Sequence, residues 1–324
     1  KKYWSIEDMK KLLAVRNDKL GDLILTLPAL RIIKSSIPGI QIDCLVDDKF
    51  SDIHLTTEFI DNVICPQNDL VSKIAARNYD YSISFFSTFN TGYKLWKSKI
   101  KKRYAPATKL AQIFYNKKIK QNRSTSIKSE YEYNNDLARY FLKDNSYEIL
   151  SSKNFYISLK KDVSVSNKKK KLVFIHPFTG GSSKTLSCND FIDLCKEINK
   201  LKDCSFILHC DYHDHSKCLE LEKLAHGLDI KTISPTRDLC EMFYNINECD
   251  LFIAGSTGPL HVAAALNKKT VGFYPTKTSS TLLRWDTIND EKNKLAFSDI
   301  GNDEQYIKVD LCGTAELISK NLLN

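Results

Sequence analysis

The chain has 324 residues, of which 42% are hydrophobic and 10% aromatic, a composition typical of a globular protein with room for two domains. No apolar run is long enough to span a bilayer, and residues 1–8 lack the apolar core of a signal peptide, so we expect a cytosolic protein whose ten cysteines are reduced. The net charge of +9 comes from the first half, because residues 1–160 hold 27 Lys and Arg against 17 Asp and Glu.

The first half begins with a strand, a loop and a helix. The apolar run 11–16 ends in a polar loop, after which apolar residues from Leu23 to Ile33 recur with helical spacing. This order is typical of the opening of an α/β domain, with Pro28 either in the first helical turn or at a kink. Further strands are expected at 41–46, 61–66 and 80–86, and a helix at 130–144.

The first loop holds a single glycine, Gly21, followed by Asp22. The three-glycine dinucleotide fingerprint is therefore absent, which argues against a nicotinamide or flavin enzyme. Asp22 at the start of the helix allows two interpretations. It is either an N-cap that satisfies backbone N–H groups, or a general base that the helix N-terminus keeps ionised.

The segment 94–128 carries twelve basic residues and no acidic one, interleaved with aromatic residues such as Trp96 and Tyr104. This combination favours a phosphate-rich partner, either a nucleic acid or an anionic membrane surface. The alternative is a solvated helix face without a partner.

In the second half, the alternation of strands and helices begins again after a polar, lysine-rich stretch. We expect one domain at 1–162, a linker at 163–171 and a second domain at 172–324. Regular alternation in the second domain predicts a parallel sheet covered by helices, and two such domains would hold a ligand in the cleft at the carboxyl ends of their strands. The expected strands are 172–175, 205–208, 230–233, 250–253 and 270–274. Helices are expected at 190–200, 219–226 and 239–246, and another begins at the turn 254–261 and runs into 262–266.

Two loops of the second domain suit an anion. In Gly255–His261, an apolar strand ends in a turn of small residues and a helix begins at once, which directs backbone N–H groups at one point. Taken alone, this turn is equally consistent with a simple connection between a strand and a helix. The earlier loop His176–Lys184 brings two glycines, hydroxyl groups and a lysine to a similar position, without the spacing of a P-loop. Together the two loops predict a site for a nucleotide diphosphate.

The stretch His209–His215, with Cys218 beyond it, is rich in residue types that bind zinc. It lacks a paired Cys-x-x-Cys, so we expect no metal here. The more plausible interpretation is a loop near the nucleotide, with Asp214 as a ribose contact.

Three stretches of the chain together resemble a known protein family. The stretch Arg16–Arg31 (RNDKLGDLILTLPALR) resembles the opening motif of the bacterial heptosyltransferases, glycosyltransferase family 9. The stretch Ser256–Leu266 (STGPLHVAAAL) resembles their C-terminal signature, and His176–Lys184 lies at the expected place between the two. Two positions depart from the pattern. Several members have Asp at Ser256, and the aromatic residue that often follows the lysine is absent after Lys184.

The resemblance implies an α/β fold of GT-B architecture, two Rossmann-like domains with parallel sheets facing an interdomain cleft. Members transfer heptose from ADP-heptose to the lipopolysaccharide inner core, inverting the anomeric centre without a metal or other cofactor. Asp22 matches the catalytic base, and an anionic lipid-linked acceptor implies a peripheral position on the inner face of the cytoplasmic membrane. The donor-binding candidates are Thr179, Gly180, Ser183, Lys184, Asp214, Ser256, Thr257, Gly258, Pro259 and His261. The candidates that face the acceptor or the membrane are Lys97, Lys101, Lys102, Arg103 and Lys109.

We therefore expect a monomeric glycosyltransferase that uses a nucleotide sugar and binds no nucleic acid. Three alternatives stay open at this point. The same fold could use another nucleotide sugar or another glycan acceptor, the segment 94–128 could bind nucleic acid, or the chain could be a regulatory nucleotide-sugar binder without catalysis.

Overall fold

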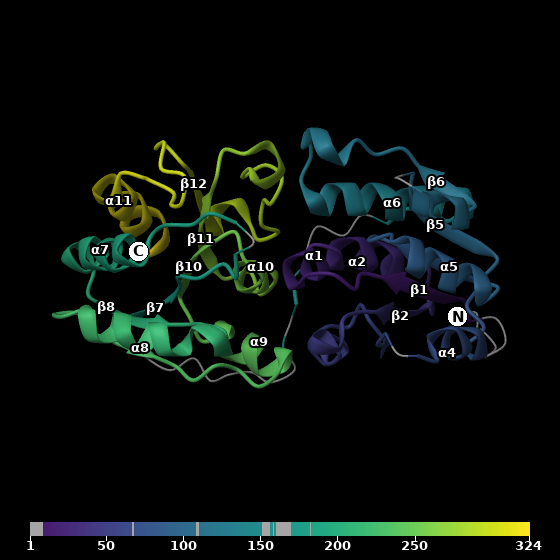
Figure 1. Ribbon diagram of the computed structural model, residues 1–324, viewed down its shortest axis with the longest axis horizontal. Coiled ribbons are helices and arrows are strands. Elements are labelled where there is room, and N and C mark those ends of the chain that lie inside the picture. Colours follow the sequence, from purple (N-terminus) through teal and green to yellow (C-terminus); the bar gives the residue numbers. More distant parts are fainter. Residues whose placement is uncertain are drawn as a thin grey trace. The chain divides into compact units, whose positions relative to one another are not determined.

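The computed structural model describes residues 9–66, 68–107, 110–150, 156–157, 159, 170–181 and 183–324. The chain forms two compact units (Figure 1). Unit 1 contains Lys1–Arg123 and Lys128–Phe155, and unit 2 contains Ser124–Ile127 and Tyr156–Asn324. Of the expected linker 163–171, residues 163–169 lie outside the described part of the chain, and Lys171 already begins a strand.

Unit 1 is built on a six-stranded parallel sheet with the order β3-β2-β1-β4-β5-β6. The order reverses between β1 and β4, which is the topological switch point where open α/β sheets bind ligands. The strands are β1 (Lys11–Val15), β2 (Gln41–Leu45), β3 (Asn62–Ile64), β4 (Tyr81–Ser84), β5 (Lys102–Pro106) and β6 (Lys117–Ile119). The helices are α1 (Leu20–Ile24), α2 (Leu27–Ser36), α3 (Ile53–Thr56), α4 (Leu70–Ala76), α5 (Phe89–Lys97) and α6 (Glu130–Asp144).

The single helix expected after β1 is two helices. α1 ends at Ile24, and α2 begins at Leu27 with Pro28 in its first turn. Proline is well tolerated there because the first helical N–H groups have no partner within the helix. The Thr26 hydroxyl donates to the Asp22 carbonyl over 2.9 Å and ties the two helices together.

Unit 2 repeats the same plan with the strand order β12-β11-β10-β7-β8-β9 and all neighbours parallel. Its switch point lies between β7 and β10. The strands are β7 (Lys171–His176), β8 (Cys204–Leu208), β9 (Ile230–Thr232), β10 (Leu251–Gly255), β11 (Lys269–Tyr274) and β12 (Lys294–Ser298). The helices are α7 (Cys188–Leu201), α8 (His215–Leu224), α9 (Leu239–Asn247), α10 (Gly258–Ala265) and α11 (Leu311–Leu322).

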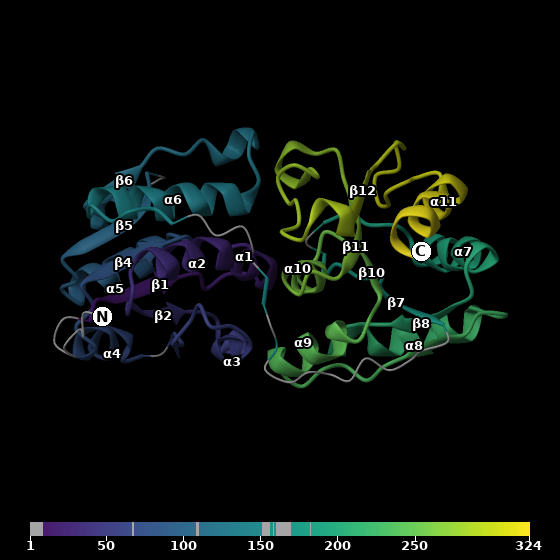
Figure 2. The same cartoon turned by 180° about the vertical axis from the view of Figure 1, so that it is seen from behind.

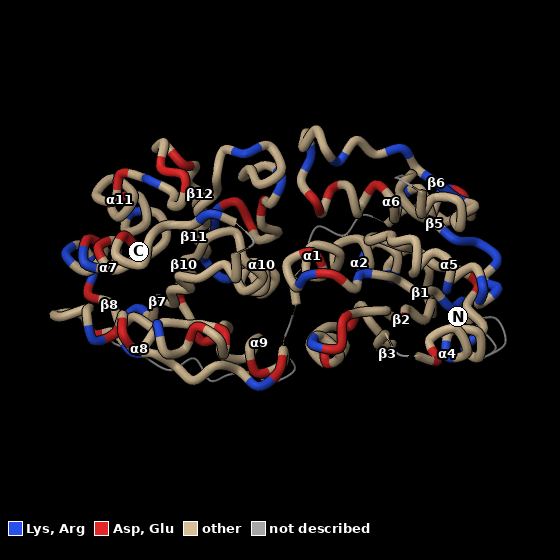
Figure 3. The backbone as a smooth tube through the Cα atoms, viewed as in Figure 1, with Lys and Arg blue, Asp and Glu red and all other residues tan. Residues whose placement is uncertain are grey.

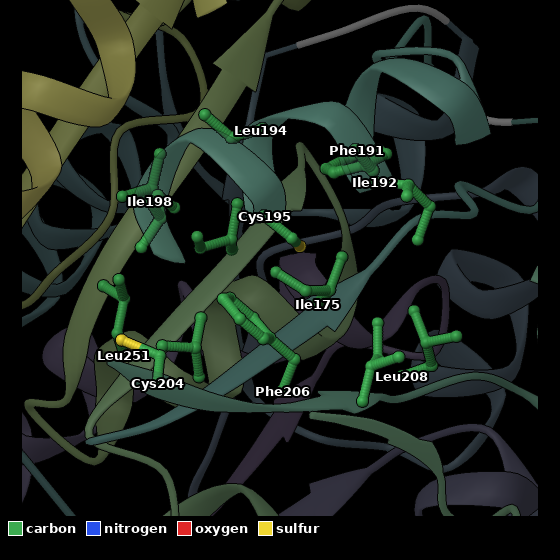
Figure 4. Close-up of a cluster of buried hydrophobic side chains, with 14 of the residues drawn as sticks. Ile175, Phe191, Ile192, Leu194, Cys195, Ile198, Cys204, Phe206, Leu208 and Leu251 are labelled. Carbon is green, nitrogen blue, oxygen red and sulfur yellow. The ribbon is translucent and has the colours of Figure 1, made fainter. Parts of the chain in front are cut away.

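The core of unit 2 lies between the sheet and helices α7, α8 and α11. Alternate residues of β7 and β8, such as Ile175 and Phe206, point toward Cys195 and Ile198 of α7 (Figure 4). Cys195 is fully buried in this cluster, so it acts as a small hydrophobic residue. α7 and α11 pack side by side in both views of the chain (Figures 1 and 2).

The parallel α/β organisation expected from the alternation of elements is confirmed in both units. Seven of the labelled helices and strands were not expected: α3, α4 and α5 in unit 1, β5 and β6 inside the basic segment, and β12 and α11 near the C-terminus. Within the described ranges, no helix has both the length and the apolar character that a bilayer crossing requires.

Candidate active site

Asp22 lies beside the switch point of the unit 1 sheet. β1 delivers the chain to Arg16, and after a short loop Asp22 occupies the first turn of α1. The N-cap of α1 is Lys19, and no side chain caps it, so the interpretation of Asp22 as an N-cap is wrong. Asp22 is 9% exposed, and its carboxylate accepts a hydrogen bond from the Arg16 guanidinium.

Arg16 is the centre of a buried ion network. Its Nε donates to Asp18 over 2.9 Å, and its Nη2 donates to Asp22. Its Nη1 donates to Glu130 Oε1 and to the Phe85 carbonyl, both over 3.1 Å. Because Phe85 follows β4, the guanidinium joins the loops after the two strands at the switch point. Arg16 thereby holds the Asp22 carboxylate in one position.

A second cation shares Glu130. Arg123 Nη1 donates to Glu130 Oε1 over 2.7 Å, and Glu130 is only 1% exposed. Glu130 is placed by the start of α6, where Ser129 and Glu132 form a capping box. The network therefore holds three carboxylates against two guanidinium groups, an arrangement with an excess of negative charge close to Asp22.

This environment changes the expected acidity of Asp22. Burial raises the pKa of its carboxyl from 3.8 to about 6, with Asp18 and Glu130 adding to the rise and Arg16 opposing it. The rise is opposite in direction to the effect of a helix N-terminus, which favours the ionised carboxylate. A carboxylate with a pKa of about 6 is still mostly ionised at neutral pH and is a stronger base than an ordinary aspartate. Arg16 stays charged, since the carboxylates overcome the effect of burial and raise its pKa.

The loop after β7 is a tight turn of small residues. Gly180 and Gly181 have φ angles of 57° and 74°, the left-handed region that glycine adopts without strain. The Thr179 hydroxyl donates to the Ser183 carbonyl over 2.8 Å and closes the turn. Ser187 then caps α7 by accepting from the Asp190 N–H over 3.1 Å.

Lys184 ends this loop with its ammonium group already engaged. Its Nζ donates to Asp299 Oδ2 over 3.0 Å and to the Asp303 carbonyl over 2.5 Å. Asp299 also accepts from the backbone N–H groups of Gly301 and Lys308, which lower its pKa together with Lys184. An ammonium group has three donors, so one remains for a ligand. The sequence offered no signal for Asp299, which lies 115 residues further along the chain.

The turn after β10 begins α10. Thr257 caps the helix by accepting from the Leu260 N–H over 3.4 Å, and Pro259 contributes no N–H at all. His261 donates its N–H to the Thr257 carbonyl over 3.4 Å. In the described part of the chain, the first-turn N–H without a partner is therefore that of Gly258. Ser256 lies just before this turn and is half-buried.

The two loops of unit 2 lie side by side. β7 and β10 are neighbours, with His176 opposite Ala254, so both loops open at the same edge. A Cβ on Gly255 would lie 2.5 Å from Thr185 Oγ1 and 3.3 Å from Thr179 Cγ2. Only glycine permits this contact, because real Cβ atoms do not approach so closely. The structure thus brings the two anion-adapted loops together at the switch point.

Buried histidines line this edge. His176 Nδ1 lies 3.1 Å from His209 Nδ1, and burial lowers the pKa of His209 to about 3. His261 is 2% exposed, and burial lowers its pKa to about 4. Its Nδ1 has no hydrogen-bond partner among the described residues, and Trp285 is its ring neighbour at 6.5 Å. These histidines are neutral at physiological pH and act as hydrogen-bonding groups rather than cations. The sequence did not indicate the His176–His209 pair.

The side chains of the stretch His209–His215 point to different parts of unit 2. Cys210 Sγ lies 3.9 Å from His215 Nδ1, whereas His209 faces His176. Asp214 pairs with Lys217 over 2.9 Å, and Lys217 lies 5.4 Å above the Phe178 ring of the loop after β7. Among the described residues of unit 2, no three His, Cys, Asp or Glu side chains bring ligand atoms within 4.8 Å of one another.

The basic candidates of unit 1 divide into two kinds. Lys97 and Lys101 are exposed. Lys102 donates to Asn145 over 2.7 Å, and the Arg103 guanidinium donates to the carbonyls of Ile100 and Phe114. Lys102 and Arg103 therefore have internal partners and are poor choices for a surface contact. Lys109 lies outside the described residues.

Comparisons with known proteins agree with this architecture. The family model of glycosyltransferase family 9 (heptosyltransferase) matches residues 68–310. A Haemophilus influenzae protein provisionally named a glycosyltransferase is 38% identical over 323 residues, which is 94% of this chain and 93% of the relative. Lipooligosaccharide heptosyltransferase 2 of Campylobacter jejuni is 24% identical over 273 residues, 81% of this chain and 80% of the relative.

A solved structure extends the comparison to the fold. The heptosyltransferase WaaC of E. coli, determined with ADP, has a TM-score of 0.74 at 20% identity, covering 96% of this chain and 97% of that one. The expected GT-B class, with two Rossmann-like α/β units, is confirmed by this likeness and by the two parallel sheets.

Proposed function

This chain belongs to glycosyltransferase family 9, the heptosyltransferase family, and we propose that it transfers heptose from ADP-heptose to the inner core of lipopolysaccharide. Family membership makes the chain a glycosyltransferase. The donor, the acceptor, inversion at the anomeric carbon and independence from metals are the finer parts of the proposal.

Asp22 is the proposed general base. It would take the proton of the acceptor hydroxyl while that oxygen bonds to the anomeric carbon and the bond from this carbon to the diphosphate breaks. A single displacement of this kind inverts the anomeric centre and needs one base. The observation that carries the proposal is the buried Asp22 carboxylate, held by Arg16 at the switch point, with a pKa raised to about 6.

The two loops of unit 2 form the proposed donor site. The diphosphate gains negative charge as it leaves, so groups that bind it more tightly in the transition state accelerate transfer. Lys184, with its remaining donor, and the Gly258 N–H at the start of α10 are suited to this role. The hydroxyls of Thr179, Ser183 and Ser256 lie in the same loops.

The proposed acceptor is an anionic lipid-linked glycan, so the protein would work as a monomer on the inner face of the cytoplasmic membrane. Another nucleotide sugar or another glycan acceptor remains the alternative within the family. Binding of a nucleic acid through the segment 94–128 is an outcome of the test below.

The test combines a binding assay and a transfer assay, both with purified protein. In the binding assay, ADP-heptose, other nucleotide sugars and ADP alone are compared by thermal shift, with a short oligonucleotide as control. Stabilisation by ADP-heptose above all others, transfer in the presence of EDTA and an inverted anomer in the product by NMR are expected. Preference for another nucleotide sugar, loss of transfer with EDTA, or a retained anomer would each remove the corresponding part of the proposal.

A further inference from the structure

Unit 1 carries an exposed group of large apolar side chains on α5 and on η3, the 3-10 turn Leu110–Phe114 that packs against it. We call this group the α5–η3 patch. Its members and their exposed fractions are Phe89 (55%), Tyr93 (39%), Trp96 (53%), Leu110 (78%) and Ile113 (66%). Exposed apolar side chains gathered in one place indicate an interaction site.

The patch is preformed. The Phe114 ring lies 4.9 Å from Phe89, 5.8 Å from Tyr93 and 6.3 Å from Trp96, measured between ring centroids. Gly92 allows this packing, because a Cβ there would lie 3.1 Å from the Phe114 ring. The three aromatic rings on α5 are therefore held in place by a fourth, and binding would order little further side-chain motion.

Several lysines belong to the same stretch of the chain as the patch. Lys97 Nζ lies 5.9 Å above the Tyr93 ring, and Lys94, Lys99 and Lys101 are near it in the chain. These four lysines have no carboxylate partner within the described ranges, in contrast to Lys117, which pairs with Asp144 over 2.8 Å. Between residues 89 and 119 the sequence holds basic residues and no acidic one, and blue segments lie along the tube near α5 and β6 in Figure 3.

We propose that the α5–η3 patch inserts into the headgroup region of an anionic phospholipid bilayer. Trp and Tyr suit this region because they combine an apolar ring with a polar group, and the unpaired lysines would meet anionic headgroups. A second copy of this chain is a poor partner, because its patch would bring lysines against lysines. The inference rests on the proposed function only in that a lipid-linked acceptor makes membrane contact useful.

The insertion differs from purely electrostatic docking in its response to salt. Salt screens the lysines and leaves apolar insertion nearly unchanged. We therefore expect a component of membrane binding that persists at high salt and depends on the aromatic residues.

The experiment is flotation of the full chain with vesicles, with no substrate present. The vesicles contain phosphatidylcholine with phosphatidylglycerol, or phosphatidylcholine alone, at low and high salt. The double variant Trp96→Gln/Leu110→Gln should lose at least about tenfold in partition coefficient at both salt concentrations. Lys97→Gln/Lys101→Gln should lose about tenfold or more at low salt and little at high salt.

The matched control is Leu55→Gln/Leu224→Gln. Its residues are 56% and 63% exposed and lie outside the patch, so binding should equal that of the wild type. Equal binding by the patch variant and the wild type, or no binding to anionic vesicles at all, would overturn the proposal. A concentration-dependent dimer that the patch variant abolishes would also overturn it, by assigning the patch to a second copy.

A transfer assay separates this inference from the proposed function. On a deacylated acceptor in solution, the patch variant should match the wild type, whereas on an acceptor embedded in vesicles its rate should fall. Vesicle binding without transfer of heptose would reject the proposed function and retain the inference. Transfer without vesicle binding would do the reverse.

Discussion

Replacement of Asp22 by Asn should remove catalysis and at the same time stabilise unit 1. The amide has the shape of the protonated carboxyl but cannot accept the acceptor's proton, so kcat should fall by about 10²- to 10⁴-fold. Affinity for ADP should stay near the wild-type value, because the two anion-adapted loops belong to unit 2.

The gain in stability follows from the raised pKa of Asp22. The difference between 3.8 and about 6 corresponds to about 3 kcal/mol against the ionised carboxylate in the folded chain. The amide of the Asp22→Asn variant does not carry that charge. The expected gain in the free energy of unfolding is therefore about 3 kcal/mol, and this figure already includes the attraction of Arg16, which opposes the rise in the pKa.

The size of this gain in stability depends on pH. Between about pH 4 and pH 6 the folded chain holds a proton on Asp22 that the unfolded chain has released, so wild-type stability falls as the pH rises through this window. The Asn variant lacks this dependence. Its advantage should be near zero at pH 4 and fully present above pH 6.

The assay is urea unfolding of both proteins at pH 4, 5, 6 and 8, followed by transfer kinetics at pH 8. Asp18→Asn is the matched control, because it removes another carboxylate from Arg16 without removing the base, and it should cost transfer less than about tenfold. An Asn variant that is less stable than the wild type at pH 8 would refute the raised pKa. Near-normal turnover of that variant would refute the assignment of Asp22 as base.

Four further outcomes are expected. For the wild type, kcat/KM should rise about tenfold per pH unit up to about pH 6 and then level off, as a pH–rate profile will show, because ionised Asp22 is the active form. Glu130→Gln should shift the rising part of this pH–rate profile to lower pH, since it removes a negative charge that raises the pKa of Asp22. An unchanged profile would contradict the coupling between Glu130 and Asp22. Lys184→Met should weaken ADP binding in calorimetry by at least about tenfold, and wild-type affinity would exclude Lys184 from the diphosphate site. Gly255→Ala should destabilise unit 2 by about 1–3 kcal/mol in denaturant unfolding, and Thr185→Ala in the same chain should restore part of the loss; a neutral Gly255→Ala would argue against the close approach of the two loops.

Most of the elements could be predicted because their signals are local. Apolar runs such as 11–16 and 250–253 become central strands buried on both faces, for which a continuous apolar run is the expected pattern. β5 and β6 escaped prediction because lysines and arginine occupy much of their length, and only Tyr104 and Ala105 of these strands are fully buried hydrophobics. Long-range packing, rather than local pattern, makes this segment a pair of strands.

Some residues of the candidate site could likewise be predicted from the sequence, and others could not. Asp22, Lys184 and the turn at Gly255 could be named from residue types at the ends of strands. Arg16, the partner of Asp22, lies only six residues away, but the more distant members of the two networks could not be named, because Glu130 lies 114 residues from Arg16 and Asp299 lies 115 residues from Lys184. Contacts at such separations leave no trace in spacing.

The sequence by itself determined the α/β class, the family and the loops that suit an anion, because these depend on local periodicity and on short motifs. Only the tertiary structure decided the acidity of Asp22 and the engagement of Lys184, since both depend on burial and on charges from distant parts of the chain. It also decided which basic residues are free at the surface. Lys97 and Arg103 look alike in the sequence, but one is exposed beside an aromatic ring and the other hydrogen-bonds carbonyl groups of its own unit.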